Sequence, residues 1–126
     1  MLKKPNAILF DLDGTLLDTA RDLGNALNQI LSTLKRPTVA YEVYRNIASD
    51  GARGMLELGF GEDLKNYDFT NLRQQFLDYY ENNICVDTDY FVGVENLLLA
   101  LNRNNVPWGI VTNKPEFLTL QLVTSF

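Results

Sequence analysis

A short apolar run near the start of the chain ends abruptly in two carboxylates. The run is Ala7-Ile8-Leu9-Phe10, and Asp11-Leu12-Asp13-Gly14-Thr15 follows it directly. Apolar residues without polar alternation are typical of a short strand that is covered on both faces of a parallel sheet. Binding residues in such sheets lie at the carboxyl ends of the strands. The sequence therefore predicts a buried strand that presents Asp11 and Asp13 at its end.

A second apolar run, Val106-Pro107-Trp108-Gly109-Ile110-Val111-Thr112, follows a segment with helical spacing over residues 94–104. A helix that leads into such a strand is half of a parallel crossover unit. Because the strands of a parallel sheet end at the same edge, we expect Thr112 to lie near Asp11 and Asp13.

The chain between the two runs shows helical patterns only. Apolar residues recur at helical spacing from Asp18 to Pro37, with Asp18 or Thr19 available as the N-cap. Further helices are predicted over residues 40–47, 51–58 and 70–83, and another begins at Glu116. The predicted fold is therefore α/β: a core formed by residues 1–17 and 88–126, with a helical insertion over residues 18–87.

Composition excludes several classes of function. The 126 residues suit a single domain of modest size, and the chain contains no histidine, which excludes a serine triad or a histidine-ligated zinc site within it. Acidic residues outnumber scattered basic ones, 16 to 11, so we expect no nucleic-acid partner. Cys85 is the only cysteine, and no apolar stretch is long enough to span a membrane, so we expect a cytoplasmic protein without a membrane segment.

The two carboxylates suggest phosphate chemistry. On an extended strand they would point to opposite faces, so both reach one ligand only if the chain bends, and Gly14 and Thr15 supply a bend. Such a bend leaves backbone N–H groups available to phosphate oxygens, and Mg²⁺ would offset the repulsion between phosphate and carboxylate. One carboxylate would attack phosphorus, the other would transfer a proton, and Thr112 would donate a hydrogen bond to the phosphoryl group. The alternative is an ordinary Asp-Gly turn after a buried strand.

Two segments carry a family resemblance. Asp11-Leu12-Asp13-Gly14-Thr15-Leu16-Leu17-Asp18-Thr19 resembles the first motif of the haloacid dehalogenase superfamily, and Val111-Thr112-Asn113-Lys114-Pro115 resembles the second. The resemblance implies a Rossmannoid parallel-sheet core, incomplete here, with an inserted α-helical cap of type one. It also implies an aspartyl-phosphate mechanism in which Asp11 is the nucleophile and Asp13 the general acid and base. The Asp11 side chain and the Asp13 backbone carbonyl would bind Mg²⁺. An aspartate at position 13 favours phosphoryl transfer over dehalogenation.

Within the superfamily, the motifs are most similar to those of the phosphoglycolate phosphatase group. Phosphate-binding candidates are Gly14, Thr15, Thr112, Asn113 and Lys114. Residues 49–54 resemble a loop that closes over the substrate, so Arg53 would read a substrate carboxylate. Arg53 as a solvated arginine and Lys114 as a surface lysine stay open as alternatives. The aromatic residues of the helical insertion are assigned to core packing rather than to the site.

The superfamily has two later motifs, a lysine and an acidic pair, which the chain does not contain. We therefore expect the N-terminal part of a longer phosphatase, inactive alone, whose sheet is completed by a homodimer or by a complementing C-terminal segment. The predicted activity is Mg²⁺-dependent hydrolysis of a small phosphorylated metabolite, with 2-phosphoglycolate, nucleoside monophosphates and sugar phosphates all open. The alternatives are a non-catalytic module that binds phosphate esters and a sugar phosphomutase.

Overall fold

A two-stranded parallel sheet contains both apolar runs. The computed structural model describes residues 5–126, so residues 1–4 of the predicted core lie outside the described part. Strand β1 (Ile8–Phe10) pairs with β4 (Trp108–Ile110), with Ile8 opposite Trp108 and Phe10 opposite Ile110. The parallel pairing predicted from the two runs is confirmed.

Helix α5 (Val94–Arg103) leads into β4, and α6 (Glu116–Val123) follows it. The predicted helix–strand–helix order is therefore confirmed. A small apolar cluster joins these elements to the loop after β1, and its buried members are Leu12, Leu16, Leu17, Leu98 and Leu122.

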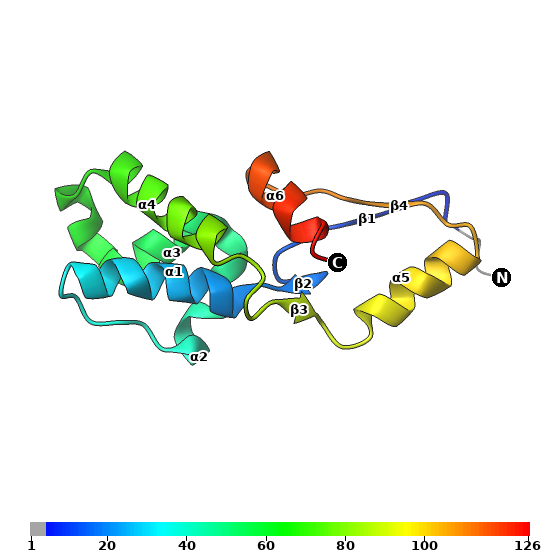
Figure 1. Ribbon diagram of the computed structural model, residues 1–126, viewed down its shortest axis with the longest axis horizontal. Coiled ribbons are helices and arrows are strands. Elements are labelled where there is room, and N and C mark those ends of the chain that lie inside the picture. Colours follow the sequence, from blue (N-terminus) through cyan, green and yellow to red (C-terminus); the bar gives the residue numbers. More distant parts are fainter. Residues whose placement is uncertain (1–4) are drawn as a thin grey trace.

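The middle of the chain folds into a group of helices that lies at one end of the molecule, opposite β1, β4 and α5 (Figure 1). They pack around a larger cluster that includes Leu27, Met55, Phe76 and Tyr80. The elements are α1 (Ala20–Thr33), α2 (Tyr41–Tyr44), the 3₁₀ helix η1 (Ala48–Asp50), α3 (Gly51–Phe60), the 3₁₀ helix η2 (Gly61–Asn66) and α4 (Phe69–Asn82).

Two features differ from the sequence-based expectation. The helix predicted over residues 40–47 is a single turn, α2, followed by turns and η1. A short antiparallel ribbon, β2 (Leu17–Asp18) with β3 (Asp89–Tyr90), was not predicted, because two residues are too few to show a period. The expected boundaries of the helical insertion, 17/18 and 87/88, lie within or beside this ribbon.

Asp22, near the start of α1, forms hydrogen bonds with residues 86–88, where the chain leaves the helical part. Its carboxylate is 4% exposed. It accepts hydrogen bonds from the backbone N–H groups of Val86 (3.1 Å) and Asp87 (2.9 Å) and from the Thr88 hydroxyl (2.6 Å). The chain enters the helical part near Asp22 and leaves it at residues 86–88, and the buried Asp22 carboxylate therefore holds these two segments together.

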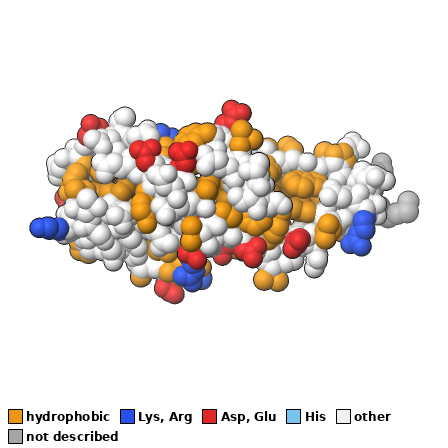
Figure 2. All heavy atoms as spheres, viewed as in Figure 1, with side chains coloured by type: hydrophobic (Ala, Val, Ile, Leu, Met, Phe, Trp, Pro, Cys, Tyr) orange, Lys and Arg blue, Asp and Glu red, His pale blue; other side chains and the backbone are white. Residues whose placement is uncertain are grey.

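The surface is acidic, in keeping with a net charge of −5, and acidic side chains are more conspicuous than basic ones on the face shown in Figure 2. Apolar side chains are exposed around the small sheet, among them Leu9 and Val111. Within residues 5–126, no helix combines the length and apolarity needed to cross a bilayer.

Candidate active site

The chain turns sharply after Asp13, as the sequence predicts. Gly14 has a φ of +80°, and the carbonyl of Leu12 accepts hydrogen bonds from the N–H groups of Thr15, Leu16 and Leu17. The Gly14 N–H donates to the Leu17 carbonyl at 3.0 Å. The N–H groups of Gly14 and Thr15 are thus used within the turn.

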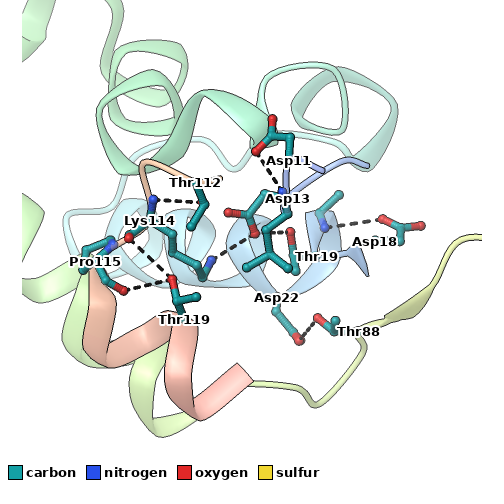
Figure 3. A network of polar contacts seen from close by, with 12 residues as sticks. Asp11, Asp13, Asp18, Thr19, Asp22, Thr88, Thr112, Lys114, Pro115 and Thr119 are labelled. Atoms are coloured by element: carbon teal, nitrogen blue, oxygen red, sulfur yellow. Dashed lines mark hydrogen bonds and ion pairs between the residues drawn. The ribbon is translucent and has the colours of Figure 1, made fainter. Parts of the chain in front are cut away.

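Asp13 is held by two donors on the same carboxylate oxygen. The Thr19 hydroxyl donates to Oδ1 at 2.7 Å, and the Lys114 ammonium group donates to it at 3.0 Å (Figure 3). Thr19 occupies the N-cap position of α1 but makes no capping hydrogen bond with its side chain, because its hydroxyl is used by Asp13. Two elements far apart in sequence therefore fix the orientation of this carboxyl group.

Lys114 lies in the loop after β4, and its side chain is only 5% exposed, so the surface-lysine alternative is wrong. Its ammonium group lies 4.3 Å from the centre of the Tyr80 ring. Burial lowers the pKa of Lys114 from its ordinary value, while the neighbouring Asp13 carboxylate opposes that shift. The backbone N–H of Lys114 donates to the Thr112 hydroxyl at 3.1 Å, which shapes the loop.

Asp11 has a different environment from Asp13. Asp11 is exposed, and its Oδ1 accepts a hydrogen bond from the N–H of Leu12 at 2.8 Å. In Figure 3 its carboxylate points away from the Lys114–Asp13–Thr19 network. The bend therefore leaves one carboxylate accessible to a ligand and the other, Asp13, oriented by hydrogen bonds.

Both carboxylates line one cavity of about 430 Å³, a size typical of small-molecule sites. It lies between the strand ends and the helical part. The predicted site residues that line it are Asp11, Asp13, Arg53, Thr112, Asn113 and Lys114.

Two predicted site residues lie elsewhere. Gly14 lines a separate hollow with Asp18 and Arg45, and Thr15 is exposed without lining the cavity. The reason is the turn itself, which closes on Leu12 and directs these residues away from Asp11 and Asp13.

Arg53 combines the two alternatives left open by the sequence. Its side chain is 68% exposed and lies 3.8 Å from Glu57, with its guanidinium group over the Phe69 ring, yet it also lines the cavity.

The structure adds residues from α4 that sequence analysis did not assign to the site. Arg73, Phe76, Leu77 and Tyr80 all line the cavity. Phe76 and Tyr80 are core residues, as predicted, and they also line the cavity. The i, i+3, i+4, i+7 spacing of this set was available in the sequence and would have placed Arg73 on the same helix face.

The oxygen donors of the site suit a hard cation. Within residues 5–126 there is no group of three His, Cys, Asp or Glu side chains that could hold a metal ion. Mg²⁺ needs fewer protein ligands, since it commonly uses one or two carboxylates and takes its other oxygens from water and substrate phosphate. The Asp11 carboxylate and the Asp13 backbone carbonyl fit that pattern.

Comparison with known proteins is consistent with this geometry. A family model described as haloacid dehalogenase-like hydrolase matches residues 8–126. The chain is 39% identical over 109 residues to an N-acetylmuramic acid 6-phosphate phosphatase of Pseudomonas putida, covering 86% of the chain and 49% of that relative. It is 40% identical over 117 residues to a phosphoglycolate phosphatase of Xanthomonas campestris, and the match covers 93% of the chain and 52% of that relative. The chain thus spans about half the length of the curated relatives it matches.

Solved structures share the fold. A crystal structure described as a predicted phosphoglycolate phosphatase from Haemophilus somnus superposes with a TM-score of 0.82 at 26% identity, covering 96% of this chain and 57% of that one. A crystal structure described as a putative phosphoglycolate phosphatase from Lactobacillus delbrueckii superposes with a TM-score of 0.83 at 25% identity, covering 98% of this chain and 61% of that one.

Proposed function

Because the chain belongs to the haloacid dehalogenase-like hydrolase family, we propose that it provides the nucleophile and the proton-transfer group of a phosphatase that hydrolyses a small phosphomonoester. The observation that carries the proposal is the pair of carboxylates, Asp11 and Asp13, in one cavity but in different environments. Relatives named as phosphatases support it.

In the first step, an oxygen of Asp11 attacks phosphorus, and the bond between phosphorus and the ester oxygen breaks. Asp13 donates its proton to the departing oxygen, so the alcohol leaves neutral and the phosphoryl group stays on Asp11. In the second step, Asp13 accepts a proton from water, which attacks phosphorus and releases phosphate and the Asp11 carboxylate. Asp13 thus returns to its protonated form.

The residues around Asp13 suit this role. Thr19 and Lys114 both bond to Oδ1, which leaves Oδ2 available for proton transfer. The Asp11 carboxylate and the Asp13 carbonyl would hold Mg²⁺, which supplies positive charge that offsets the repulsion between Asp11 and phosphate oxygens. Thr112, Asn113 and Lys114 lie in the same cavity and would contact the phosphoryl group.

The helical part is proposed as a cap. Residues 18–87 form one wall of the cavity, and residues 1–17 and 88–126 carry the strand ends that form the other, as far as residues 5–126 describe them. A substrate such as 2-phosphoglycolate would be enclosed between them. We further propose that the protein acts in the cytoplasm, in keeping with its single cysteine.

The test is phosphate release from 2-phosphoglycolate by the 126-residue chain, with and without Mg²⁺, beside Asp11→Asn. Mg²⁺-dependent release that Asp11→Asn abolishes would support hydrolysis and would overturn the expectation that the chain alone is inactive. Release at the same rate by Asp11→Asn would contradict the proposal.

Two other outcomes separate the alternatives. Substrate binding without release would agree both with a non-catalytic module that binds phosphate esters and with a phosphatase part that is inactive alone. Interconversion of sugar phosphate isomers without net phosphate release would favour a phosphomutase.

A further inference from the structure

The cavity has two differently charged sides. Asp11, Asp13 and Lys114 lie at the strand ends, and Lys114 is paired with Asp13. The helical side contributes Arg53 from α3, Arg73 from α4 and one carboxylate, Asp50, from η1. A phosphate group alone would occupy only a small part of about 430 Å³. A ligand that fills the cavity would therefore place its phosphate near the carboxylates and the rest of the molecule near the arginines.

Arg73 differs from the other two cations of the cavity. Lys114 is paired with Asp13 at 3.0 Å, and Arg53 lies 3.8 Å from Glu57. Within residues 5–126, no carboxylate lies within 4.0 Å of the Arg73 guanidinium group, and that group makes no side-chain hydrogen bond. Among the described residues, Arg73 is thus an exposed cation of the cavity lining without a paired carboxylate.

The position of Arg73 follows from the face of α4 to which it belongs. Phe76, Leu77 and Tyr80 continue the same face toward the interior, and all three line the cavity. This buried face anchors the helix, so the backbone of Arg73, one turn earlier, is held beside the cavity by a packed element rather than by a loop, and its side chain is exposed. A guanidinium group can form two parallel hydrogen bonds to a carboxylate, so an arginine on this wall suits a ligand that carries one.

We propose that Arg73, together with Arg53, binds a carboxylate at the end of the substrate remote from the phosphate, and that Arg73 determines specificity for carboxylated phosphomonoesters. The proposal rests on the function proposed above. It applies to a short substrate such as 2-phosphoglycolate and to a long one such as N-acetylmuramic acid 6-phosphate, because both combine a phosphomonoester with a carboxylate.

Two pairs of ligands isolate the carboxylate. Ethyl phosphate lacks the carboxylate of 2-phosphoglycolate, and N-acetylglucosamine 6-phosphate lacks the lactyl carboxylate of N-acetylmuramic acid 6-phosphate. Binding of all four to the 126-residue chain is measured by calorimetry with Mg²⁺ present, which requires no turnover. The chain is expected to bind the carboxylated member of at least one pair about tenfold or more tightly, as for a charge-assisted contact.

Substitutions of Arg73 test whether this residue causes the preference for the carboxylated ligand. Arg73→Gln is expected to weaken binding of the carboxylated ligand far more than binding of the uncarboxylated one and so to lose most of the preference, and Arg73→Lys is expected to retain part of it. Arg103→Gln, an exposed arginine at the end of α5 that does not line the cavity, is the matched control and should keep the preference.

The outcomes separate this inference from the proposed function. If the chain binds phosphate esters but shows no preference in either pair, or if Arg73→Gln keeps the preference, the inference is overturned and the proposed function stands. If the chain binds none of the four ligands, both are overturned.

Discussion

At the scale of single residues, the site depends on how Asp13 is held. Thr19 is 1% exposed and donates to Asp13 at 2.7 Å. Replacing Thr19 with valine keeps the shape of the side chain and removes the donor. We expect Thr19→Val to lower the free energy of unfolding by about 1.5–3 kcal/mol, the range for a hydrogen bond to a charged group. Urea denaturation measures the change.

A control lies on the same helix. Thr33 is exposed, and its hydroxyl donates to the backbone carbonyl of Gln29. Thr33→Val should change the free energy of unfolding by less than about 0.5 kcal/mol. Equal effects of the two substitutions would contradict a specific role for the Thr19–Asp13 contact.

Cys85 provides a pH-dependent prediction. Burial raises the pKa of its thiol above the ordinary value, a hydrogen bond with Ser125 opposes the shift, and the charges of Asp22 and Asp89 add to it. The folded state therefore keeps the thiol protonated to higher pH than the unfolded state. The associated stability is present below the unfolded-state pKa and is lost as pH rises through the folded-state pKa.

Alkylation by iodoacetamide reports this pKa directly, because the chain has only one cysteine. The midpoint of the rate-against-pH curve is expected at higher pH for the native chain than for the chain in urea. A native midpoint at or below the unfolded one would contradict the partial burial of Cys85.

Residue types were easier to predict than residue contacts. The order of Asp11, Asp13 and Thr112 at the ends of apolar runs was sufficient to place them in one cavity. The contact between Asp13 and Lys114 joins positions 101 residues apart, which no local pattern reports. At Gly14 and Thr15 the sequence shows that a turn forms but not where its N–H groups point, so it did not predict that these residues lie outside the cavity lining.

At the scale of elements, the Asp22 contacts make a testable link between α1 and residues 86–88. Asp22→Asn replaces one acceptor oxygen by a donor that would face other donors. We expect a loss of about 2–3 kcal/mol in the free energy of unfolding, measured by urea denaturation. Asp78→Asn, at an exposed position of α4, is the control and should cost less than about 0.5 kcal/mol.

Gly24 in α1 gives a second test at this scale. Alanine normally stabilises a helix by about 1 kcal/mol relative to glycine. A Cβ atom at position 24 would overlap the buried ring of Tyr44, and overpacking of this kind costs about 1–3 kcal/mol. Gly24→Ala is therefore expected to lower the thermal midpoint, whereas Asn25→Ala, at the exposed neighbouring position, should raise it slightly. A higher midpoint for Gly24→Ala would contradict the packing of α1 against α2.

Long elements with a clear period were predicted well, and short ones were not. Helices α1 and α4 bury one face each, whereas α5 buries Leu98, and the spacing of all three was visible in the sequence. The ribbon of β2 and β3 contains two residues per strand, and its pairing depends on the chain returning beside Leu17 and Asp18. Residues 89–90 come to lie beside residues 17–18 only because the helical part between them folds, and neither segment alone predicts this.

At the scale of the whole molecule, the two apolar clusters differ in size. The cluster of the helical part includes residues from α1, α3 and α4, whereas the cluster beside the sheet consists of only a few leucines among the described residues. Local stability follows the density of buried apolar contacts. We expect amide hydrogens in α1 and α4 to exchange roughly tenfold or more slowly than those in β1 and β4. Uniform exchange across the chain, measured by mass spectrometry, would contradict this difference.

The central claim is that Asp11 is the group that accepts the phosphoryl moiety. Trifluoroberyllate, which binds carboxylates as a mimic of an acyl phosphate, tests it without requiring turnover. With Mg²⁺ present, we expect a protein-bound ¹⁹F resonance that is lost in Asp11→Asn and kept in Asp50→Asn, which changes a third carboxylate of the same cavity. A resonance that persists in Asp11→Asn, or none in the unmodified chain, would contradict the account.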